Sequence, residues 1–444
     1  MIRFLIVFIC FFALSIPANA ASCRSGLFSS IYKTTSEQTY ADLSTGSLTY
    51  QNSVGHDDIL MGSFKTLDRV NELIQSAQKN IYVQTWRFNR GSKLAKSFAS
   101  GLVKLSNRRR KLGAKNPIHV WMMINVIASQ FPDYEKKANE QFFDKYDLNN
   151  EFMQVHVGIF VSNFLATNHA KTVSVDDKVS VIMGLNISNG ASRPNMFDLG
   201  FAVRGEIVHE INRDFVEIWH RYINSDQLAP TLPEQGLSKH MATNCLPIMF
   251  TRNEPYSPLS TTIRHSSINE ALLSSIRQAK STIDILTPDM NVKVFLQAIK
   301  EAILAKVKVR IVLSYTLLAS LTQNIPTRGG ENIVNVARLY NSLGGYTSRD
   351  YYCKYLQIKW YANPPNDTLS KKKHAANHGK FMAIDDRVTY IGSANMDNQS
   401  WVNSREIGLF LDNPALTKSW LNQMFNPIFS QATTAKECGG SSPQ

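Results

Sequence analysis

Hydrophobic and polar positions follow one order of helix-like and strand-like segments, and this order occurs twice along the chain. Helical spacing of apolar residues alternates with short apolar runs that are typical of buried strands. The segments are 71–79, 80–84, 94–105, 118–124 and 154–160 in the first half, and 270–280, 283–286, 294–304, 307–313 and 357–361 in the second. Alternating helices and apolar strands predict an α/β fold, in which each half is a mixed, largely parallel sheet flanked by helices. We therefore expect two pseudo-symmetric α/β domains.

The boundary between the domains is expected where the alternating pattern stops. From Leu228 to about Pro258 the sequence is polar and rich in proline, which is typical of a connecting segment. This predicts an N-terminal domain over 21–235, a linker over 236–258 and a C-terminal domain over 259–444. Both predicted domains have an ordinary size.

The first 20 residues have the pattern of an export signal. Arg3 precedes an apolar run over 4–16, and Ala18-Asn19-Ala20 supplies an Ala-x-Ala ending. The run is shorter than the roughly 20 apolar residues that a membrane-spanning helix needs. We expect cleavage after Ala20 and a secreted or periplasmic mature protein; the alternative is an uncleaved membrane anchor.

Composition adds a preference for anionic partners. The 444 residues carry a formal net charge of +13, so phospholipid headgroups, nucleic acid and other phosphates are favoured encounters. Removal of Cys10 with the signal leaves an even set of cysteines: Cys23, Cys245, Cys353 and Cys438. In an exported protein these predict two disulfides in one of three pairings, with free buried thiols as the alternative. Their spacing is not that of a metal site, so we expect no metal.

The strongest signal is a ten-residue sequence motif that occurs twice. Residues 168–177 read NHAKTVSVDD and residues 377–386 read NHGKFMAIDD, and each is expected to form a strand, a turn and a return strand. Counting from each His, a Lys follows at +2, an Asp at +7, an Asn at +17 and an acid at +29 or +28. The two sets are His169, Lys171, Asp176, Asn186 and Asp198, and His378, Lys380, Asp385, Asn395 and Glu406.

These residue types suit the cleavage of a phosphodiester. A neutral imidazole can attack phosphorus while a second imidazole, protonated, donates a proton to the leaving oxygen. Two lysines and two asparagine amides can surround the non-bridging oxygens and stabilise the charge of the transition state. An acid such as Asp198 or Glu406 can hold the other ring nitrogen of a histidine and so set its tautomer.

The paired motifs resemble the phospholipase D superfamily, whose signature is His-x-Lys-x4-Asp followed by Gly-Ser/Gly-x-Asn, in two copies that meet at an interface. The second copy, Gly392-Ser393-Ala394-Asn395, is nearly complete. In the first copy Met183 replaces the usual first glycine, and Gln399 stands where many members have arginine. The resemblance extends from about residue 50 to about residue 425.

The resemblance implies a two-step reaction without metal or cofactor, through a phosphohistidine. It implies His169 as the nucleophile and His378 as the general acid and then base, although both halves present the same groups. Lys171, Lys380, Asn186 and Asn395 would form the phosphate clamp, and Asp198 and Glu406 would orient the histidines. Ser393 and Gly184 are expected to contact substrate, whereas Asp176 and Asp385, at the hairpin turns, are expected to have a structural role.

The core chemistry does not choose the substrate. Export favours hydrolysis of phospholipids at a membrane surface, with possible transfer to an alcohol, and the apolar stretch 157–165 is either a contact for acyl chains or a buried strand. A non-specific nuclease is one alternative, supported by the basic run 108–111, although the sequence has no recognisable nucleic-acid-binding module. An exported phosphatidyltransferase similar to cardiolipin synthase is another. Both motifs lie in one chain, so we expect a monomer.

Overall fold

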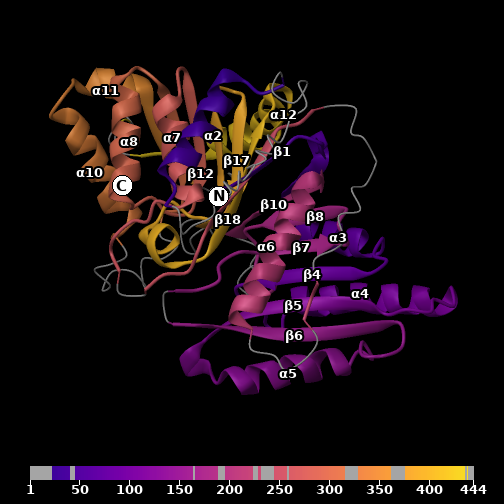
Figure 1. The fold of residues 1–444 in the computed structure, drawn as a ribbon. Helices are drawn as coiled ribbons and strands as arrows, with labels where there is room; N and C mark the ends of the chain where they lie inside the picture. The colour runs from indigo at the N-terminus through magenta and orange to yellow at the C-terminus, as the bar shows by residue number, and fades with distance from the viewer. Residues whose placement is uncertain are drawn as a thin grey trace, which may run out of the picture.

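The computed structural model describes residues 23–40, 46–163, 166–188, 196–223, 229–231, 245–257, 260–315, 329–361, 376–435 and 438. The expected signal peptide, residues 232–244 and the end of the apolar stretch at 164–165 lie outside the described residues. Two large sheets organise the fold (Figure 1).

The first sheet is built from the first half of the chain. In sheet order its strands are β2 (Asn52–Ser53), β10 (Leu199–Gly205), β8 (Val179–Met183), β7 (Thr172–Val175), β4 (Asn80–Thr85), β5 (Ile118–Ile127) and β6 (Met153–Ser162), with β3 (Ile59–Met61) also paired to β10. Strands β4, β5 and β6 pair in parallel, and β7 and β8 form a hairpin beside them.

The second sheet repeats this arrangement. In sheet order its strands are β1 (Ser47–Thr49), β11 (Ile248–Asn253), β18 (Glu406–Asp412), β17 (Val388–Gly392), β16 (Phe381–Ile384), β12 (Thr282–Thr287), β13 (Lys308–Leu313), β14 (Leu356–Trp360) and β19 (Thr433–Thr434). The parallel strands β12, β13 and β14 correspond to β4, β5 and β6, and the hairpin of β16 and β17 corresponds to β7 and β8. A small parallel pair, β9 (Met196–Phe197) with β15 (Ala376–Asn377), joins the two halves.

The α/β class with helix-flanked sheets is confirmed, but the expectation of largely parallel sheets is wrong. Within the described residues, parallel pairing inside the two large sheets is confined to β4–β5–β6 and β12–β13–β14, and the remaining pairs are antiparallel. A short turn accounts for the antiparallel hairpins β7–β8 and β16–β17. The antiparallel pairs β11–β18, β12–β16 and β4–β7 join strands that are far apart along the chain, so their direction is set by which strands meet in the folded protein.

Helices form layers on both sides of the sheets. The outer face of the first sheet is covered by α3 (Ser63–Ile74), α4 (Lys93–Lys111) and α5 (Pro132–Asp144). The outer face of the second is covered by α2 (Gly26–Gln38), α7 (Ser267–Gln278), α8 (Lys293–Leu304), α10 (Asn332–Gly344) and α11 (Arg349–Tyr355). Between the sheets lie α6 (Glu206–Tyr222), α12 (Pro414–Trp420) and α13 (Asn426–Gln431). Short helical turns are η1 (His56–Asp58), η2 (Ala128–Gln130), η6 (Gln399–Asn403) and η7 (Leu421–Phe425).

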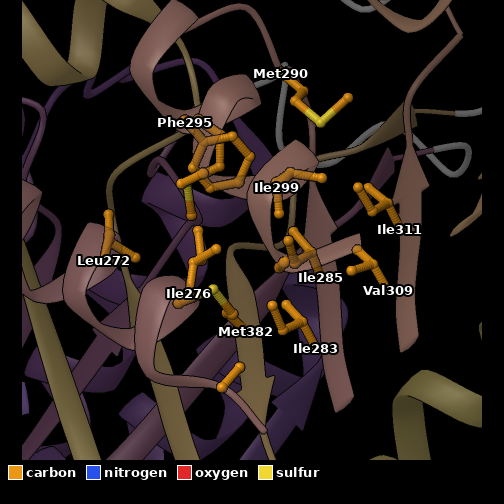
Figure 2. Close-up of a cluster of buried hydrophobic side chains, with 14 of the residues drawn as sticks. Leu272, Ile276, Ile283, Ile285, Met290, Phe295, Ile299, Val309, Ile311 and Met382 are labelled. Carbon is orange, nitrogen blue, oxygen red and sulfur yellow. The ribbon is translucent and has the colours of Figure 1, made fainter. Parts of the chain in front are cut away.

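Apolar side chains fill both the outer layers and the space between the halves. Figure 2 shows the outer core of the second half, where Leu272 and Ile276 of α7 and Phe295 of α8 face Ile283 and Ile285 of β12. Burying one such side chain contributes about 1.5–3 kcal/mol. A separate cluster joins residues of both halves, among them Ile182, Phe201, Phe381, Ile391 and Leu409. This shared core holds the two repeated hairpins against each other.

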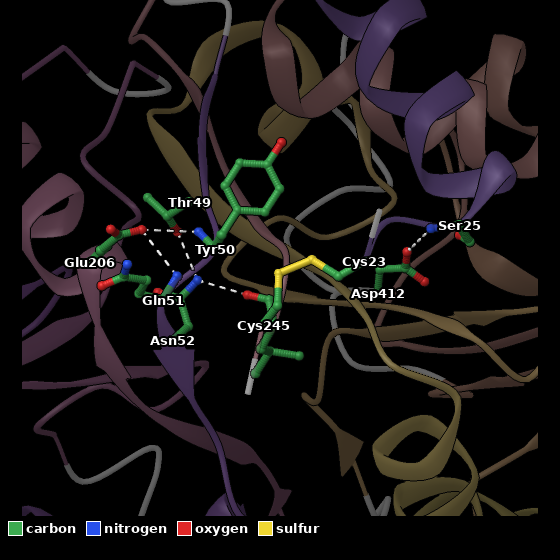
Figure 3. The surroundings of a disulfide bond; sticks show 10 residues. Cys23, Ser25, Thr49, Tyr50, Gln51, Asn52, Glu206, Cys245 and Asp412 are labelled. Atoms are coloured by element: carbon green, nitrogen blue, oxygen red, sulfur yellow. Dashed lines mark hydrogen bonds between the residues drawn. A yellow bond between two sulfur atoms is a disulfide. The ribbon is translucent and has the colours of Figure 1, made fainter. Parts of the chain in front are cut away.

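The N-terminal segment crosses to the second half. In Figure 1, α2 lies beside α7, and β1 pairs with β11. A disulfide joins Cys23 to Cys245, and beside it the backbone amides of Tyr50 and Gln51 donate to the Glu206 carboxylate (Figure 3). The second disulfide joins Cys353 to Cys438. The structure thus chooses one of the three possible pairings, while the expected domain limits at 235 and 259 stay a prediction.

Candidate active site

Each copy of the repeated motif forms a backbone hydrogen bond with the opposite half of the chain. The amide of His169 donates to the carbonyl of Arg405 at 2.9 Å, just before β18 of the second sheet. The amide of His378 donates to the carbonyl of Phe197 at 2.7 Å, just before β10 of the first sheet. Each histidine therefore sits at the start of its own hairpin and against the other half.

The carboxylates that orient the histidines are exchanged between the halves. His169 Nδ1 lies 2.9 Å from Glu406 Oε1, and His378 Nδ1 lies 2.9 Å from Asp198 Oδ2. A carboxylate at Nδ1 sets the tautomer and leaves Nε2 for chemistry. The motif predicts the four residues, but the crossed pairing is visible only in the structure.

Electrostatics link the two histidines into one site. Burial, with Lys171 and Lys380, holds the pKa of His169 well below its usual value, and the charge of His378 contributes in the same direction. Burial and Lys380 also lower the pKa of His378. Both shifts favour the neutral imidazole, the form in which a histidine can act as a nucleophile.

The lysines face the same centre. Lys171 Nζ donates to the carbonyl of His169, and Lys380 Nζ donates to that of His378, both at 2.5 Å. Burial lowers the pKa of Lys171 to about 7 and that of Lys380 to about 8. For Glu406, which both lysines attract, burial dominates and raises the pKa to about 7. Several charged groups thus share one small buried volume, which is typical of a functional site.

The two asparagines offer unused hydrogen-bonding capacity. Asn186 follows β8 and Asn395 follows β17, and both side chains are buried. Within the described residues, the Oδ1 atom of each has no hydrogen-bond partner. Buried polar atoms are usually satisfied, so these amides are candidates to contact a bound ligand.

Ser393 and Gly184 lie beside the two carboxylates that hold the histidines, and their expected contact with substrate stays a prediction. Ser393 is fully buried, and its hydroxyl donates to Glu406 Oε2 at 2.5 Å, so it supports the carboxylate of His169. Gly184 lies beside the other pair, where a Cβ atom would come within 2.1 Å of Asp198 Oδ1 and 3.1 Å of the His378 carbonyl oxygen. The first copy of the motif thus has glycine next to Asp198, where the second copy has serine next to Glu406.

Asp176 and Asp385 hold the far ends of the hairpins. The Asp176 carboxylate accepts hydrogen bonds from the amides of Gln78, Lys79 and Asn80, and the Asp385 carboxylate accepts them from the amides of residues 280–282. Each aspartate has a left-handed backbone, with φ of 50° and 53° respectively. These contacts fasten the hairpin turn to the start of the neighbouring parallel strand.

Two residues of the site have no signal in the repeated spacing. The ring of Trp86 lies 5.4 Å from the ring of His169. Arg405 is fully buried, and its guanidinium contacts Asp214 and donates to Gln84 and Asn168, the latter two at 3.0 Å. An arginine directly before the motif acid is the only hint in the sequence, because its partners are far away along the chain.

The described residues contain no group of three or more His, Cys, Asp or Glu side chains that could hold a metal ion. In the same part of the chain, no helix combines the length and the apolar character that crossing a bilayer requires.

Known proteins similar to this chain act on phospholipids, according to their names. Residues 272–428 match the family described as "Cardiolipin synthase, PLD-like domain". Cardiolipin synthase 2 of Staphylococcus epidermidis is 23% identical over 383 residues, which cover 85% of this chain and 68% of that protein. Cardiolipin synthase of Geobacillus kaustophilus is 26% identical over 270 residues, which cover 57% of this chain and 44% of that protein.

A solved structure shares the fold. Phosphatidylserine synthase of Haemophilus influenzae Rd KW20 superposes with a TM-score of 0.60 over 88% of this chain and 90% of that one, at 14% identity. Because its sequence is so distant, this likeness supports the fold alone. The match of residues 272–428 and the similarity of most of the chain to cardiolipin synthases support the assignment of this protein to the phospholipase D superfamily.

Proposed function

We propose that the protein transfers a phosphatidyl group from a phospholipid to an alcohol, through a covalent intermediate on His169. The observation that carries this proposal is the pair of buried histidines, each held at Nδ1 by a carboxylate from the opposite half. The sequence favours hydrolysis, with transfer as an alternative. The similar proteins named cardiolipin synthase favour transfer, so water becomes the competing acceptor.

The reaction has two displacements at phosphorus. First, His169 Nε2 attacks, the bond from phosphorus to the headgroup oxygen breaks, and His378 gives its proton to that oxygen. Next, the acceptor hydroxyl attacks, the bond from phosphorus to nitrogen breaks, and His378 takes the hydroxyl proton. Burial and the neighbouring lysines lower the pKa of His169, which favours the neutral imidazole that a nucleophile requires. Binding of the anionic phosphodiester raises the pKa of His378, so that it enters the first step protonated.

The remaining groups stabilise charge. Lys171 and Lys380 lie beside the histidine carbonyls, and the side-chain amides of Asn186 and Asn395 can donate to a phosphate through Nδ2, which in Asn395 donates to Asp397 Oδ2 at 3.0 Å in the free protein. Once they donate to the bound phosphate, these four groups stabilise the negative oxygens of the transition state. The Asp198 and Glu406 carboxylates keep both imidazoles aligned through the two steps.

One assay panel tests the function. Purified protein is given phosphatidylcholine vesicles with glycerol in the presence of EDTA, and the products are separated as phosphatidylglycerol, phosphatidic acid and choline. We expect phosphatidylglycerol in excess over phosphatidic acid, and neither product with the His169→Ala variant. Phosphatidic acid alone would identify a hydrolase. Degradation of plasmid or single-stranded DNA with intact lipid would replace the proposal by a nuclease.

We also propose that the protein is exported, because residues 1–20 have the pattern of a signal and four cysteines form two disulfides. Fractionation of producing cells, with N-terminal sequencing of the product, tests this. An intracellular product that still starts at Met1 would contradict export.

The two lysines predict a loss of activity at high pH. Because the pKa of Lys171 is about 7 and that of Lys380 about 8, both ammonium groups are charged at lower pH and are lost as the pH rises through these values. We expect kcat/KM, which reports the free enzyme, to fall between pH 7 and pH 9. Circular dichroism over the same range controls for unfolding. A flat profile up to pH 9.5 would show that the lysine charges are not needed.

A further inference from the structure

A polar pocket lies beside the proposed catalytic centre, on the side of the first half. Its volume is about 670 Å³, within the range of pockets that bind small ligands. Its walls come from the ends of β4 and β5, the start of α5 and the segment after β8, and its lining residues include Arg87, Arg90, Asn125, Gln130, Glu135 and Ser188. We call it the Arg87 pocket.

Three segments connect the Arg87 pocket to the histidine site. Asn125, in the pocket wall, accepts a hydrogen bond at 2.8 Å from the amide of Asn168, which precedes His169. The amide of Ser188 donates to the carbonyl of Asn186 at 2.8 Å. Arg87 follows Trp86, whose ring contacts the ring of His169. The pocket thus borders residues that lie one or two positions along the chain from His169, Asn186 and Trp86.

Of the two arginines in the pocket, Arg90 pairs with a carboxylate, whereas Arg87 pairs with none in the described part of the chain. Arg90 donates to Glu135 at 2.6 Å and to Asn139 at 3.2 Å. The Arg87 guanidinium lies 4.2 Å from the ring centroid of Trp86, and no acidic side chain of the described residues forms an ion pair with it. The pocket therefore contains one guanidinium that is held in place by an aromatic ring, is open to solvent and has its donors available.

We propose, on the basis of the proposed function, that the Arg87 pocket holds the acceptor alcohol and that Arg87 binds an anionic group, such as a phosphate, carried by that alcohol. A guanidinium offers two parallel donors to a phosphate or carboxylate, and stacking on Trp86 fixes their plane before the ligand arrives. A neutral alcohol gains nothing from this residue. Arg87 is therefore a specificity-determining residue of the acceptor step.

The anionic group can belong to a soluble alcohol phosphate or to a lipid headgroup. Along the chain, Phe131 directly follows the lining residue Gln130 and Tyr134 directly precedes the lining residue Glu135. The two side chains are 75% and 66% exposed. Exposed aromatic side chains at a pocket rim are typical of contact with a lipid interface. The experiment therefore supplies the acceptor in both forms.

The test measures acceptor preference. With phosphatidylcholine vesicles as donor, kcat/KM is determined for glycerol 3-phosphate and for glycerol, and the ratio of the two is compared between proteins. Because Arg87→Ala removes a charge-assisted hydrogen bond to the anionic group, it should lower the ratio roughly 10- to 100-fold. Arg87→Lys, which keeps the charge without the fork, should restore part of it. Arg108→Ala, at the exposed end of α4, is the matched control and should keep the wild-type ratio.

A second arm replaces glycerol 3-phosphate by vesicles of phosphatidylglycerol as a lipid-borne acceptor. A lower ratio for Arg87→Ala in either arm supports the acceptor site, and the responding arm identifies the source of the anionic group. An unchanged ratio in both arms overturns it, provided that thermal unfolding shows a folded variant.

Binding separates this inference from the proposed function. Calorimetry with glycerol 3-phosphate and with short-chain phosphatidylglycerol needs no turnover. Weaker binding of either probe to Arg87→Ala than to wild type supports the site even if the wild-type protein transfers nothing, in which case only the proposed function fails. The site is contradicted if wild type and Arg87→Ala bind each probe with equal affinity, or if the wild type binds neither probe.

Discussion

Replacement of His169 by alanine is expected to lower kcat/KM for phosphatidyl transfer by a factor on the order of 10⁴ or more, because the nucleophile is removed. Replacement of His378 by alanine should cost about 10²–10⁴-fold, the usual contribution of a general acid and base. His265→Ala, on an exposed side chain paired with Glu270, is the matched control and should leave kcat/KM unchanged.

A substrate with an activated leaving group distinguishes the two roles. A 4-nitrophenyl phosphodiester needs no proton donor for its first step, so His378→Ala should release nitrophenol in a burst and accumulate a phosphorylated protein. Mass spectrometry of the digested protein should place the phosphoryl group on His169. His169→Ala should give no burst and no adduct. An adduct on His378 in that variant would reverse the assignment.

The second large effect concerns stability. Arg405→Met should lower the free energy of unfolding by about 1–3 kcal/mol, because buried acceptors lose this donor while Asp214 Oδ1 keeps its pair with Arg252. Arg405 and Asp214 are 0% and 1% exposed, and the guanidinium also donates to Gln84 and Asn168. Urea unfolding measures the change. Arg110→Met, which removes an exposed pair with Asp147, should change stability by less than about 1 kcal/mol.

A double variant separates the lost attraction from the cost of the carboxylate oxygen that loses its donor. If Asp214 is replaced as well, by leucine, the oxygen that faced Arg405 is removed, and Arg252, which also pairs with Asp214, keeps Glu217 and Glu254. Part of the stability should therefore return, with an interaction energy of about 0.5–3 kcal/mol between the two sites. Equal midpoints for Arg405→Met and wild type would show that the pair contributes nothing to the joining of the halves.

The position of Arg405 also explains how near-identical motifs can differ in role. The Arg405 carbonyl accepts a hydrogen bond from the amide of His169. The carbonyl of Phe197, whose ring packs near Tyr361, accepts one from the amide of His378. Ser393 supports Glu406 in one pair, and Gly184 leaves room for Asp198 in the other. Two copies of one motif thus experience different burial, charges and hydrogen bonds, which supports a division of labour between nucleophile and proton carrier.

Local patterns were sufficient to predict the repeated elements. The strand expected over 80–84 is β4 (Asn80–Thr85), the helix expected over 294–304 is α8, and the strands expected on either side of Asp176 are β7 and β8. These predictions succeed because hydrophobic periodicity and turn residues act over a few neighbours. The same locality explains the error about parallel sheets, because pairing direction depends on which strands meet.

The sequence by itself determined the duplicated α/β elements, the two His, Lys and Asn sets and the acids near them, since these follow from residue type and spacing. Only the tertiary structure decided that Glu406 serves His169 and Asp198 serves His378, that Cys23 pairs with Cys245, and that α2 packs on the second half. The Arg87 pocket and the buried Arg405 belong to this second group. The physical reason is that all these contacts join residues far apart in the chain, and packing of the two halves against one another selects them among many chemically equivalent partners.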